Sequence, residues 1–192
     1  RAIRTDNGVP FSARSLFGLS KLSVLWLRLG IEVERIAPGH PEQNGRHERM
    51  HRTLKAATQK PQAANLLQQQ ERFEQFQTIF NDERPHEALD MKSPSDIYEP
   101  SERKYLSVLD DFEYSSDMWI RRVAACGTIS LKWATKLFIS QALAGQQIGL
   151  REEEDGIMAI YFMNYRLGYH DKQARHFTEG PNPFFEYRNY NL

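Results

Sequence analysis

The chain has 192 residues, 40% of them apolar, which is enough for one or two domains with a packed core. Its 25 basic and 25 acidic side chains balance, and its single cysteine, Cys126, excludes an internal disulfide framework and a zinc site built from cysteines. No run approaches the roughly 18 apolar residues of a membrane helix, so we expect no membrane span. The lone cysteine also fits a reducing compartment, and we expect a cytoplasmic protein.

The charges are unevenly distributed along the chain. Residues 1–60 hold eleven Lys and Arg against five Asp and Glu, whereas residues 61–192 hold fourteen against twenty. A basic first part suits a polyanionic partner for that part of the chain.

Residues 1–36 predict a strand, a helix and a second strand. Residues 2–5 read as a short strand that ends in the turn-forming run Asp6-Asn7-Gly8. Ser12 or Ser15 is expected to cap a helix that ends near Gly30, where glycine can adopt the left-handed conformation. Residues 31–36 begin with alternating polarity and predict the second strand. The expected apolar stripe of the helix consists of Leu22, Leu25, Trp26 and Leu29.

The stretch from residue 38 to residue 60 predicts a polar loop followed by a helix. Two prolines and two glycines fall within residues 38–45, and neither Gly nor Pro occurs in residues 46–60. On a helix, Glu48, Arg52 and Lys55 share a face. One carboxylate would therefore lie among cations just inside a helix, an arrangement that suits a metal-binding carboxylate and a nucleic-acid substrate.

Beyond residue 60 the pattern changes from helical to β. A second helix is expected over residues 62–81, and Ser93 followed by Pro94 is typical of a helix start. Residues 100–116 are mixed and polar and are interpreted as a linker. Short strands then suggest a small β-barrel over residues 117–171, and the tail, residues 172–192, shows no period. The expected strands cover residues 118–124, 128–133, 137–140, 147–152 and 157–162.

Several of these segments resemble a known family. Residues 4–8, Arg-Thr-Asp-Asn-Gly, and residues 38–55, Pro-Gly-His-Pro-Glu-Gln-Asn-Gly-Arg-His-Glu-Arg-Met-His-Arg-Thr-Leu-Lys, look like the second and third parts of the Asp-Asp-Glu core of insertion-sequence transposases and retroviral integrases. Residues 84–98 are similar to the closing segment of the bacterial members. Residues 121–169 look like the small SH3-like barrel that follows the core in one bacterial branch.

The resemblance implies a ribonuclease-H-like α/β core over residues 1–99, followed by the small all-β barrel. It also implies DNA strand cleavage and transfer with Mg²⁺ or Mn²⁺. Asp6 corresponds to the second acidic residue of the family and Glu48 to the third, so both are predicted metal ligands. The partners would be DNA, as transposon ends and target, and further copies of the full-length chain at the bacterial nucleoid. The predicted DNA contacts are His40, Asn44, His51, Arg52 and Lys55.

The first acidic residue of the family, with its β-hairpin, has no counterpart in this sequence. We therefore expect a C-terminal fragment of a transposase or integrase with its first strands missing, inactive by itself. The alternative is a catalytically inactive DNA-binding remnant of a truncated element.

Two other assignments compete for residues 38–55. Glu42 lies closer than Glu48 to the family's usual spacing from Asp6, but the Asn44-Gly45 turn followed by Glu-Arg favours Glu48. Residues 47–51, His-Glu-Arg-Met-His, satisfy the H-E-x-x-H pattern of zinc peptidases. Such a site needs a third ligand. The extended motif fails, because Leu54 and Ala57 stand where its Gly and His should be. Glu71 lies at a distance where a downstream Glu could be a ligand, but Pro61 intervenes, and the arginines of this helix disfavour Zn²⁺.

Overall fold

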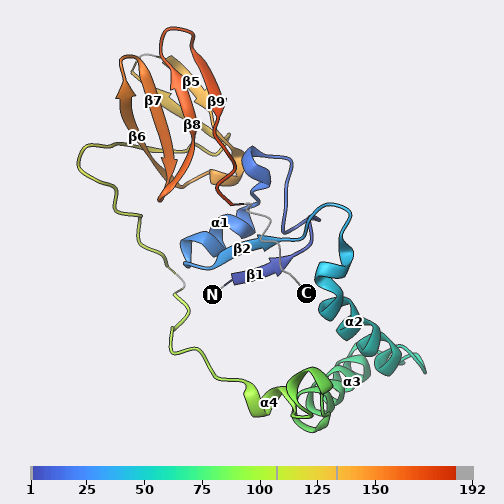
Figure 1. Cartoon of the computed structure of the whole chain (residues 1–192). Helices are drawn as coiled ribbons and strands as arrows, with labels where there is room; N and C mark the ends of the chain where they lie inside the picture. The colour runs from blue at the N-terminus through green and yellow to red at the C-terminus, as the bar shows by residue number, and fades with distance from the viewer. Residues whose placement is uncertain (1, 107, 133, 185–192) are drawn as a thin grey trace. The chain divides into compact units, whose positions relative to one another are not determined.

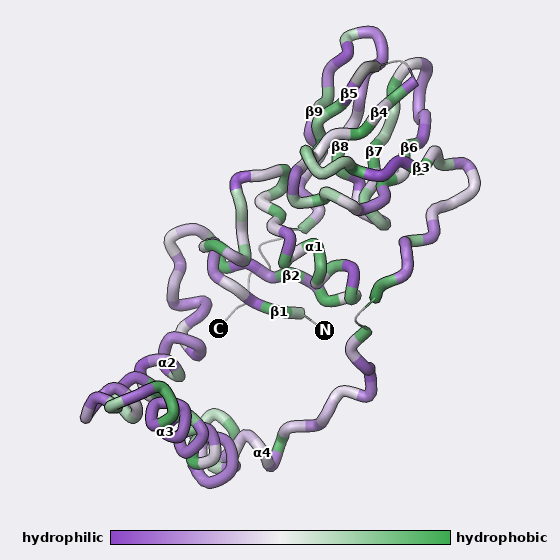
Figure 2. Tube along the Cα trace, turned by 180° about the vertical axis from the view of Figure 1, so that it is seen from behind, coloured by the Kyte–Doolittle hydropathy of each residue, from purple (hydrophilic) through white to green (hydrophobic). Residues whose placement is uncertain are grey.

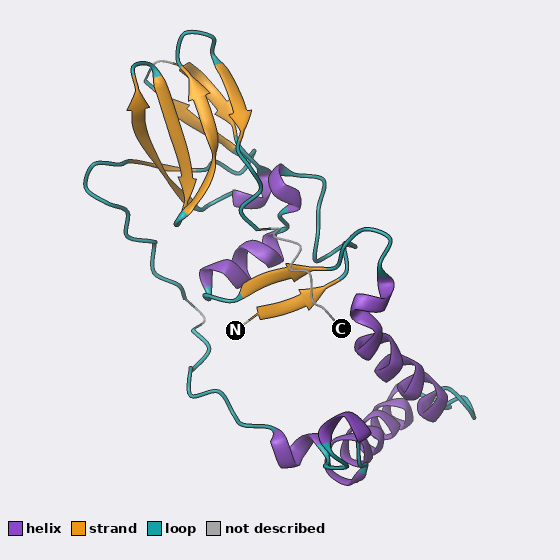
Figure 3. Cartoon of the chain, viewed as in Figure 1, coloured by secondary structure: helices purple, strands orange, loops and turns teal. Residues whose placement is uncertain are grey.

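The computed structural model describes residues 2–106, 108–132 and 134–184, and its contacts divide into two compact units. The first unit comprises residues 1–43 together with residues 107–192, and the second comprises residues 44–106. Figure 3 shows the mixture of helices and strands in the chain. Strands occur in the first unit, whereas the described elements of the second unit are helical.

The first unit opens with a βαβ arrangement. Strand β1 (Ala2–Thr5) pairs in parallel with β2 (Glu32–Arg35), with Ile3 opposite Val33. Parallel neighbours cannot be joined by a tight turn, and here helix α1 (Lys21–Arg28) lies in the connection. Figure 1 shows α1 beside the strand pair. The expected order of strand, helix and strand is therefore confirmed.

The start of α1 differs from the expectation. Its cap is Ser20, whose Oγ accepts a hydrogen bond from the Ser23 N–H while the Ser23 Oγ accepts one from the Ser20 N–H. Ser12 and Ser15 lie instead in a loop with one 3-10 turn, η1 (Leu16–Gly18), where Phe17 has a φ of 54°. That backbone conformation cannot continue into a helix.

The buried face of α1 is rotated from the expected stripe. Val24 and Leu27 are buried, whereas Leu25 is 39% exposed. The helix begins at residue 21. A helix capped by Ser12 or Ser15 would have begun several residues earlier in the chain. Gly30 has a φ of 68°, which confirms it as the left-handed end of the helix.

Residues 119–179 form a β module with two sheets. Its five-stranded antiparallel sheet has the order β3-β6-β7-β8-β9, and β4 (Thr128–Leu131) pairs separately with β5 (Ala134–Phe138). These sheets are compatible with a small β domain. The strands of the larger sheet are β3 (Trp119–Arg122), β6 (Gln147–Glu154), β7 (Ile157–Phe162), β8 (Tyr165–Asp171) and β9 (His176–Glu179).

The β module is longer than expected. Strands β8 and β9 were not predicted, and β9 lies within the tail that showed no period. Gly168 interrupts the pattern of β8, and a Cβ at this position would collide with the Thr178 carbonyl oxygen of β9, so glycine permits this strand pairing. Trp133, which the expected strand 128–133 included, and tail residues 185–192 lie outside the described residues.

The core of the first unit is concentrated in the β module. Many of the fully buried side chains lie on strands β6 to β8. Gly127 and Gly156 lie in turns between strands, and each has a φ of 81°. The largest of these apolar side chains are Ile148, Leu150, Met158, Ile160, Phe162 and Leu167. Each side chain of this size stabilises the fold by about 1.5–3 kcal/mol when it leaves water.

The β module also contacts the βαβ part within the first unit. The Arg28 Nη1 atom of α1 donates to Gln146 Oε1 at 2.5 Å, and Nη2 donates to the Leu109 and Asp110 carbonyl oxygens. The Phe17 and Phe184 rings lie 5.9 Å apart between centroids. Residues 1–43 and 108–184 are therefore joined by polar and aromatic contacts.

The second unit is a set of helices without a large buried apolar cluster. Helices α2 (Gly45–Thr58) and α3 (Leu66–Thr78) agree with the two expected helices. Helix α2 begins one residue earlier and ends two residues earlier than expected, and α3 is shorter at both ends. Within this unit, whose residues are all described, the buried residues are Thr58 and Ser93. Figure 2 colours most of α2 and α3 as hydrophilic. Leu66 and Leu67 are 84% and 81% exposed, so this unit presents apolar side chains at its surface.

Shorter helical elements complete the second unit. The π turn η3 (Ile79–Glu83) continues α3, and η4 (Glu87–Leu89) precedes α4 (Pro94–Ile97). Ser93 and Asp96 form a capping box, which confirms the predicted helix start. None of the helices in the described ranges has both the length and the apolar character that crossing a bilayer requires.

Candidate functional site

Asp6 follows β1 in an exposed turn. Its Oδ1 accepts a hydrogen bond from the Gly8 N–H at 2.8 Å, the local bond of an Asx turn. The same turn is tied to the end of β2, because Asn7 Nδ2 donates to the Ile36 carbonyl oxygen at 2.9 Å. Among the described residues the Asp6 Oδ2 atom has no hydrogen-bond partner, so one carboxylate oxygen faces solvent on a turn that is fixed on both sides.

Glu48 lies in the first turn of α2 and is exposed. A negative charge at a helix N-terminus interacts favourably with the helix dipole, which by itself explains an acidic residue here. No ion pair joins Glu48 to Arg52 within the described structure, although their spacing would allow one. The carboxylate is therefore available to a ligand.

The positive charge of α2 extends along its length. Arg46, Arg49, Arg52 and Lys55 are exposed, and Glu48 is the one acidic residue of this helix. Arg52 and Lys55 fall on the side of Glu48, as the helical period predicts. Such a helix attracts a polyanion in a way that does not depend on base sequence.

The loop before α2 contains a second predicted DNA contact. His40 Nδ1 lies 2.7 Å from Glu42 Oε1, and both side chains are exposed. The Glu42 backbone N–H and then the His40 ring hold the pKa of the Glu42 carboxyl below its usual value. Glu42 is thus paired locally. Asn44 is the N-cap residue of α2, although its side chain makes no capping hydrogen bond.

The two histidines of α2 are in contact. Their Nε2 atoms lie 2.9 Å apart, and the rings meet edge to face with centroids 4.3 Å apart. His51 was predicted as a DNA contact, and His47 belongs to the H-E-x-x-H pattern. Over the residues that the structure describes, no group of three or more His, Cys, Asp or Glu is placed to hold a metal ion. A peptidase-type zinc site with three protein ligands is therefore not formed by these residues.

The predicted site residues divide between the two units. Asp6 and His40 belong to the first unit, and the other residues belong to the second. The structure brings His40 to Glu42 and His47 to His51. It describes Asp6 and Glu48 in separate units, so their shared metal site stays a prediction. The second-unit site residues are Asn44, Glu48, His51, Arg52 and Lys55.

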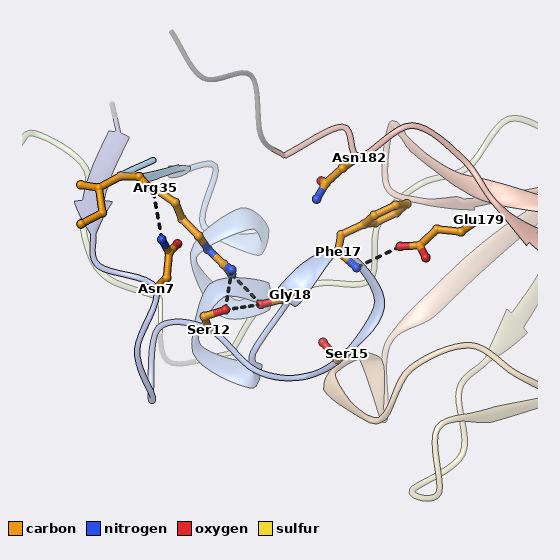
Figure 4. A pocket seen from close by; sticks show the side chains of 9 residues that line it. Asn7, Ser12, Ser15, Phe17, Gly18, Arg35, Glu179 and Asn182 are labelled. Carbon is orange, nitrogen blue, oxygen red and sulfur yellow. Dashed lines mark hydrogen bonds between the residues drawn. The ribbon is translucent and has the colours of Figure 1, made fainter. Parts of the chain in front are cut away.

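Sequence reasoning missed a polar hollow of about 390 Å³ beside the turn that carries Asp6. Figure 4 shows its lining, with Arg35 pointing into the loop of residues 12–18. Arg35 Nη1 donates to Ser12 Oγ and Nη2 to the Gly18 carbonyl oxygen, both at 2.6 Å. Burial lowers the pKa of the Arg35 guanidinium. The sequence feature that could have indicated this hollow is Arg35, a basic residue at the end of the partly buried strand β2.

A further hydrogen bond in this hollow joins two of its lining residues. Glu179 Oε1 accepts a hydrogen bond from the Phe17 N–H at 3.3 Å, which links β9 of the β module to the same loop. Several polar groups of the hollow are thus engaged within the protein and support the loop that follows Asp6.

Residues 29–94 match the integrase core domain family. The match begins just before β2 and extends to the first residue of α4, so it includes the predicted metal ligand Glu48 and all five predicted DNA contacts. Asp6 and the β module lie outside it. The match supports an integrase or transposase catalytic core, a family whose fold is ribonuclease-H-like and whose partner is DNA. It supports DNA integration as the general function.

Proposed function

We propose that this chain takes part in DNA integration as the C-terminal portion of a transposase or integrase-type recombinase. The observation that carries the proposal is the integrase core match over residues 29–94, because Glu48 lies inside it on the basic helix α2. The parallel β1–β2 pair with α1 in its connection is the kind of unit found in a ribonuclease-H-like sheet. The working form is expected to contain several copies of the chain.

DNA would approach the cationic side chains of α2. Arg52 and Lys55 would contact phosphates, and such contacts fix the position of the backbone without reading sequence. His51, Asn44 and His40 would add hydrogen-bonding groups, since all three lie on or directly before the helix. Binding should weaken as salt rises, because phosphate contacts release counterions.

Asp6 and Glu48 would hold a divalent metal ion, Mg²⁺ or Mn²⁺. The fit rests on the donor set: both carboxylates are exposed, and Mg²⁺ binds through one or two carboxylates while it keeps several waters. When bound, such an ion supplies charge stabilisation at the phosphorus centre and at the oxygens that attack and leave. The chain's own part is to hold the two carboxylates, one on a turn fixed by the Asn7–Ile36 bond and the other on the first turn of α2.

The test is metal-dependent nicking of DNA by the complete gene product that contains this chain. Glu48→Gln removes one carboxylate charge and keeps the shape, and we expect nicking to fall by roughly 100-fold or more, since a metal ion supplies several kcal/mol and about 1.4 kcal/mol is tenfold. DNA binding, followed by fluorescence anisotropy, should be retained. Glu71→Gln changes an exposed glutamate on α3 and is the matched control.

The outcomes separate the candidate functions. A Glu48→Gln protein that nicks DNA as fast as its parent would contradict the assignment of Glu48. A parent protein that binds DNA without cleaving it in Mg²⁺ or Mn²⁺ would favour the non-catalytic DNA-binding remnant.

A further inference from the structure

Helix α2 carries a pair of histidines, of which the proposed function uses only His51, as a DNA contact. His47 and His51 are both exposed, and their Nε2 atoms converge to 2.9 Å on the helix surface. Two imidazoles four residues apart lie on one helix face, because a helix advances 3.6 residues per turn. In their neutral forms, with the protons on Nδ1, both Nε2 atoms present lone pairs to the same point in space.

We propose that His47 and His51 form a two-imidazole binding site for a first-row transition metal ion such as Ni²⁺ or Cu²⁺. Metal–imidazole bonds are about 2.0–2.1 Å long, so two nitrogens at a right angle around one ion lie about 2.9 Å apart. Two tetrahedral ligands would lie about 3.3 Å apart. The 2.9 Å between the Nε2 atoms is the length of a hydrogen bond from one ring to the other in the metal-free protein, and the same spacing fits two ligands at a right angle around Ni²⁺ or Cu²⁺.

The surroundings of the pair allow a cation. With about 100° per residue, Arg46, Arg49 and Arg52 lie about 120° or more around the helix from the middle of the histidine pair. Lys55 lies nearer, at about 60° and one turn beyond His51, and Glu48, the acidic residue of this helix, lies at about 80°. The arginines of α2, which count against a zinc site in the sequence, thus lie away from the two imidazoles, and Glu48 supplies a negative charge on the same side as Lys55.

The two imidazole ligands determine how tightly the site binds an ion and which ions it prefers. Among the described residues no third His, Cys, Asp or Glu joins the pair, so water completes the coordination of the ion. Binding should be reversible and removable by a chelator, unlike the tightly held zinc of a peptidase. Imidazole nitrogen prefers Ni²⁺, Cu²⁺ and Zn²⁺, whereas Mg²⁺ prefers oxygen, so this site differs in chemistry from the proposed carboxylate site and does not depend on it.

Binding would also affect the helix itself. An ion held by both imidazoles links two positions one turn apart near the beginning of α2, and a ligand that binds only the folded form stabilises it. Amide hydrogen exchange in the first turns of α2 should therefore slow when Ni²⁺ is added.

The experiment is a calorimetric titration of the untagged 192-residue chain with Ni²⁺. Every protein carries Cys126→Ser, because the exposed thiol of Cys126 would bind the same ions. We expect one Ni²⁺ per chain, with the affinity at least about tenfold lower in His47→Gln and in His51→Gln, because each variant leaves one imidazole and loses the intramolecular second contact. His176→Gln, an exposed histidine of β9, is the matched control and should bind as the parent does.

A second comparison keeps the number of histidines constant. His51→Gln combined with Arg52→His places the imidazoles five residues apart, about 140° around the helix, and should bind as weakly as His51→Gln alone. Excess Mg²⁺ should not displace Ni²⁺ from the parent. Equal Ni²⁺ affinity in parent and His47→Gln, retained affinity in the five-residue variant, or displacement by Mg²⁺ would each overturn the proposal. None of these readouts requires DNA cleavage, so the result is independent of the proposed function.

Discussion

Among the β-module residues whose burial is described, His170 is the fully buried ionisable side chain, with 1% of it exposed in strand β8. Across the sheet it faces Met158 of β7 and Phe177 of β9. Within the described structure its Nδ1 atom has no hydrogen-bond partner. Burial lowers the pKa of His170 below 6.5, with Asp171 acting in the opposite direction and His176 in the same direction. The folded β module therefore favours the neutral ring.

This pKa shift predicts a pH-dependent stability. In the unfolded chain His170 takes up a proton near pH 6.5, whereas in the folded chain it does so at lower pH. The contribution of His170 to the free energy of unfolding is therefore complete above pH 6.5 and is lost as the pH falls below that value. His170→Leu should lose this contribution to the pH slope and change stability at pH 7.5 by less than about 1.5 kcal/mol. Urea unfolding at pH 7.5 and 5.5 measures the slope, with His86→Gln in the second unit as the control. An unchanged slope in His170→Leu would contradict the explanation.

At single positions, sequence reasoning placed residues on their elements better than it predicted which side chains they contact. It placed Glu48 just inside a helix, and the exposed first-turn position agrees. It treated His51 and His40 as separate polar contacts, whereas His51 contacts His47 and His40 contacts Glu42. Side-chain pairing depends on rotamers, which spacing alone does not specify.

The capping box of α1 is the device that fixes where the first helix begins. Ser20 is 8% exposed and Ser23 is fully buried, so the two N–H groups that they satisfy have little access to water. Ser20→Ala should lower the free energy of unfolding by about 1 kcal/mol, within a range of about 0.5–2 kcal/mol. Urea unfolding followed by tryptophan fluorescence measures the change. The exposed Ser116→Ala is the control, and an equal effect of both substitutions would argue against the cap.

The elements that could be predicted are those with strong local signals. Helix α2 lies between a Gly- and Pro-containing loop and Pro61, and Ser93-Pro94 starts α4, so both were found within a few residues. The start of α1 was missed because three serines compete as caps, and the conformation of Phe17 decides among them. Strand β9 was missed because it is an edge strand with mostly exposed side chains and has no apolar alternation.

At the scale of the whole chain, the contacts group residues that are far apart in sequence. Residues 1–43 and 107–192 form one compact unit, although more than sixty residues separate them along the chain. Sequence periodicity reports local structure, so it could propose a core, a linker and a barrel in series but could not show which segments pack together. The side chain that makes most of the polar contacts between the two segments is Arg28, on the last turn of α1.

Replacing Arg28 should loosen the first unit. Arg28→Met keeps much of the aliphatic length but removes the bonds to Gln146, Leu109 and Asp110, and a hydrogen bond to a charged group contributes about 1.5–3 kcal/mol. Because the three bonds share one guanidinium, we expect a total loss of about 2–3 kcal/mol rather than the sum. Arg14→Met, at an exposed arginine of the same unit, should change stability by less than about 0.5 kcal/mol.

Two measurements check this expectation. Urea unfolding gives the loss of stability, and limited proteolysis reports whether residues 108–116, which Arg28 holds through two backbone carbonyls, become easier to cleave. Faster cleavage in this segment for Arg28→Met than for Arg14→Met is expected, because the segment contains no helix or strand of its own in its described part and depends on such contacts. Equal cleavage rates and equal stabilities in the two variants would contradict this role of Arg28 and would leave the apolar core and the contact of Phe17 with Phe184 to hold the segments together.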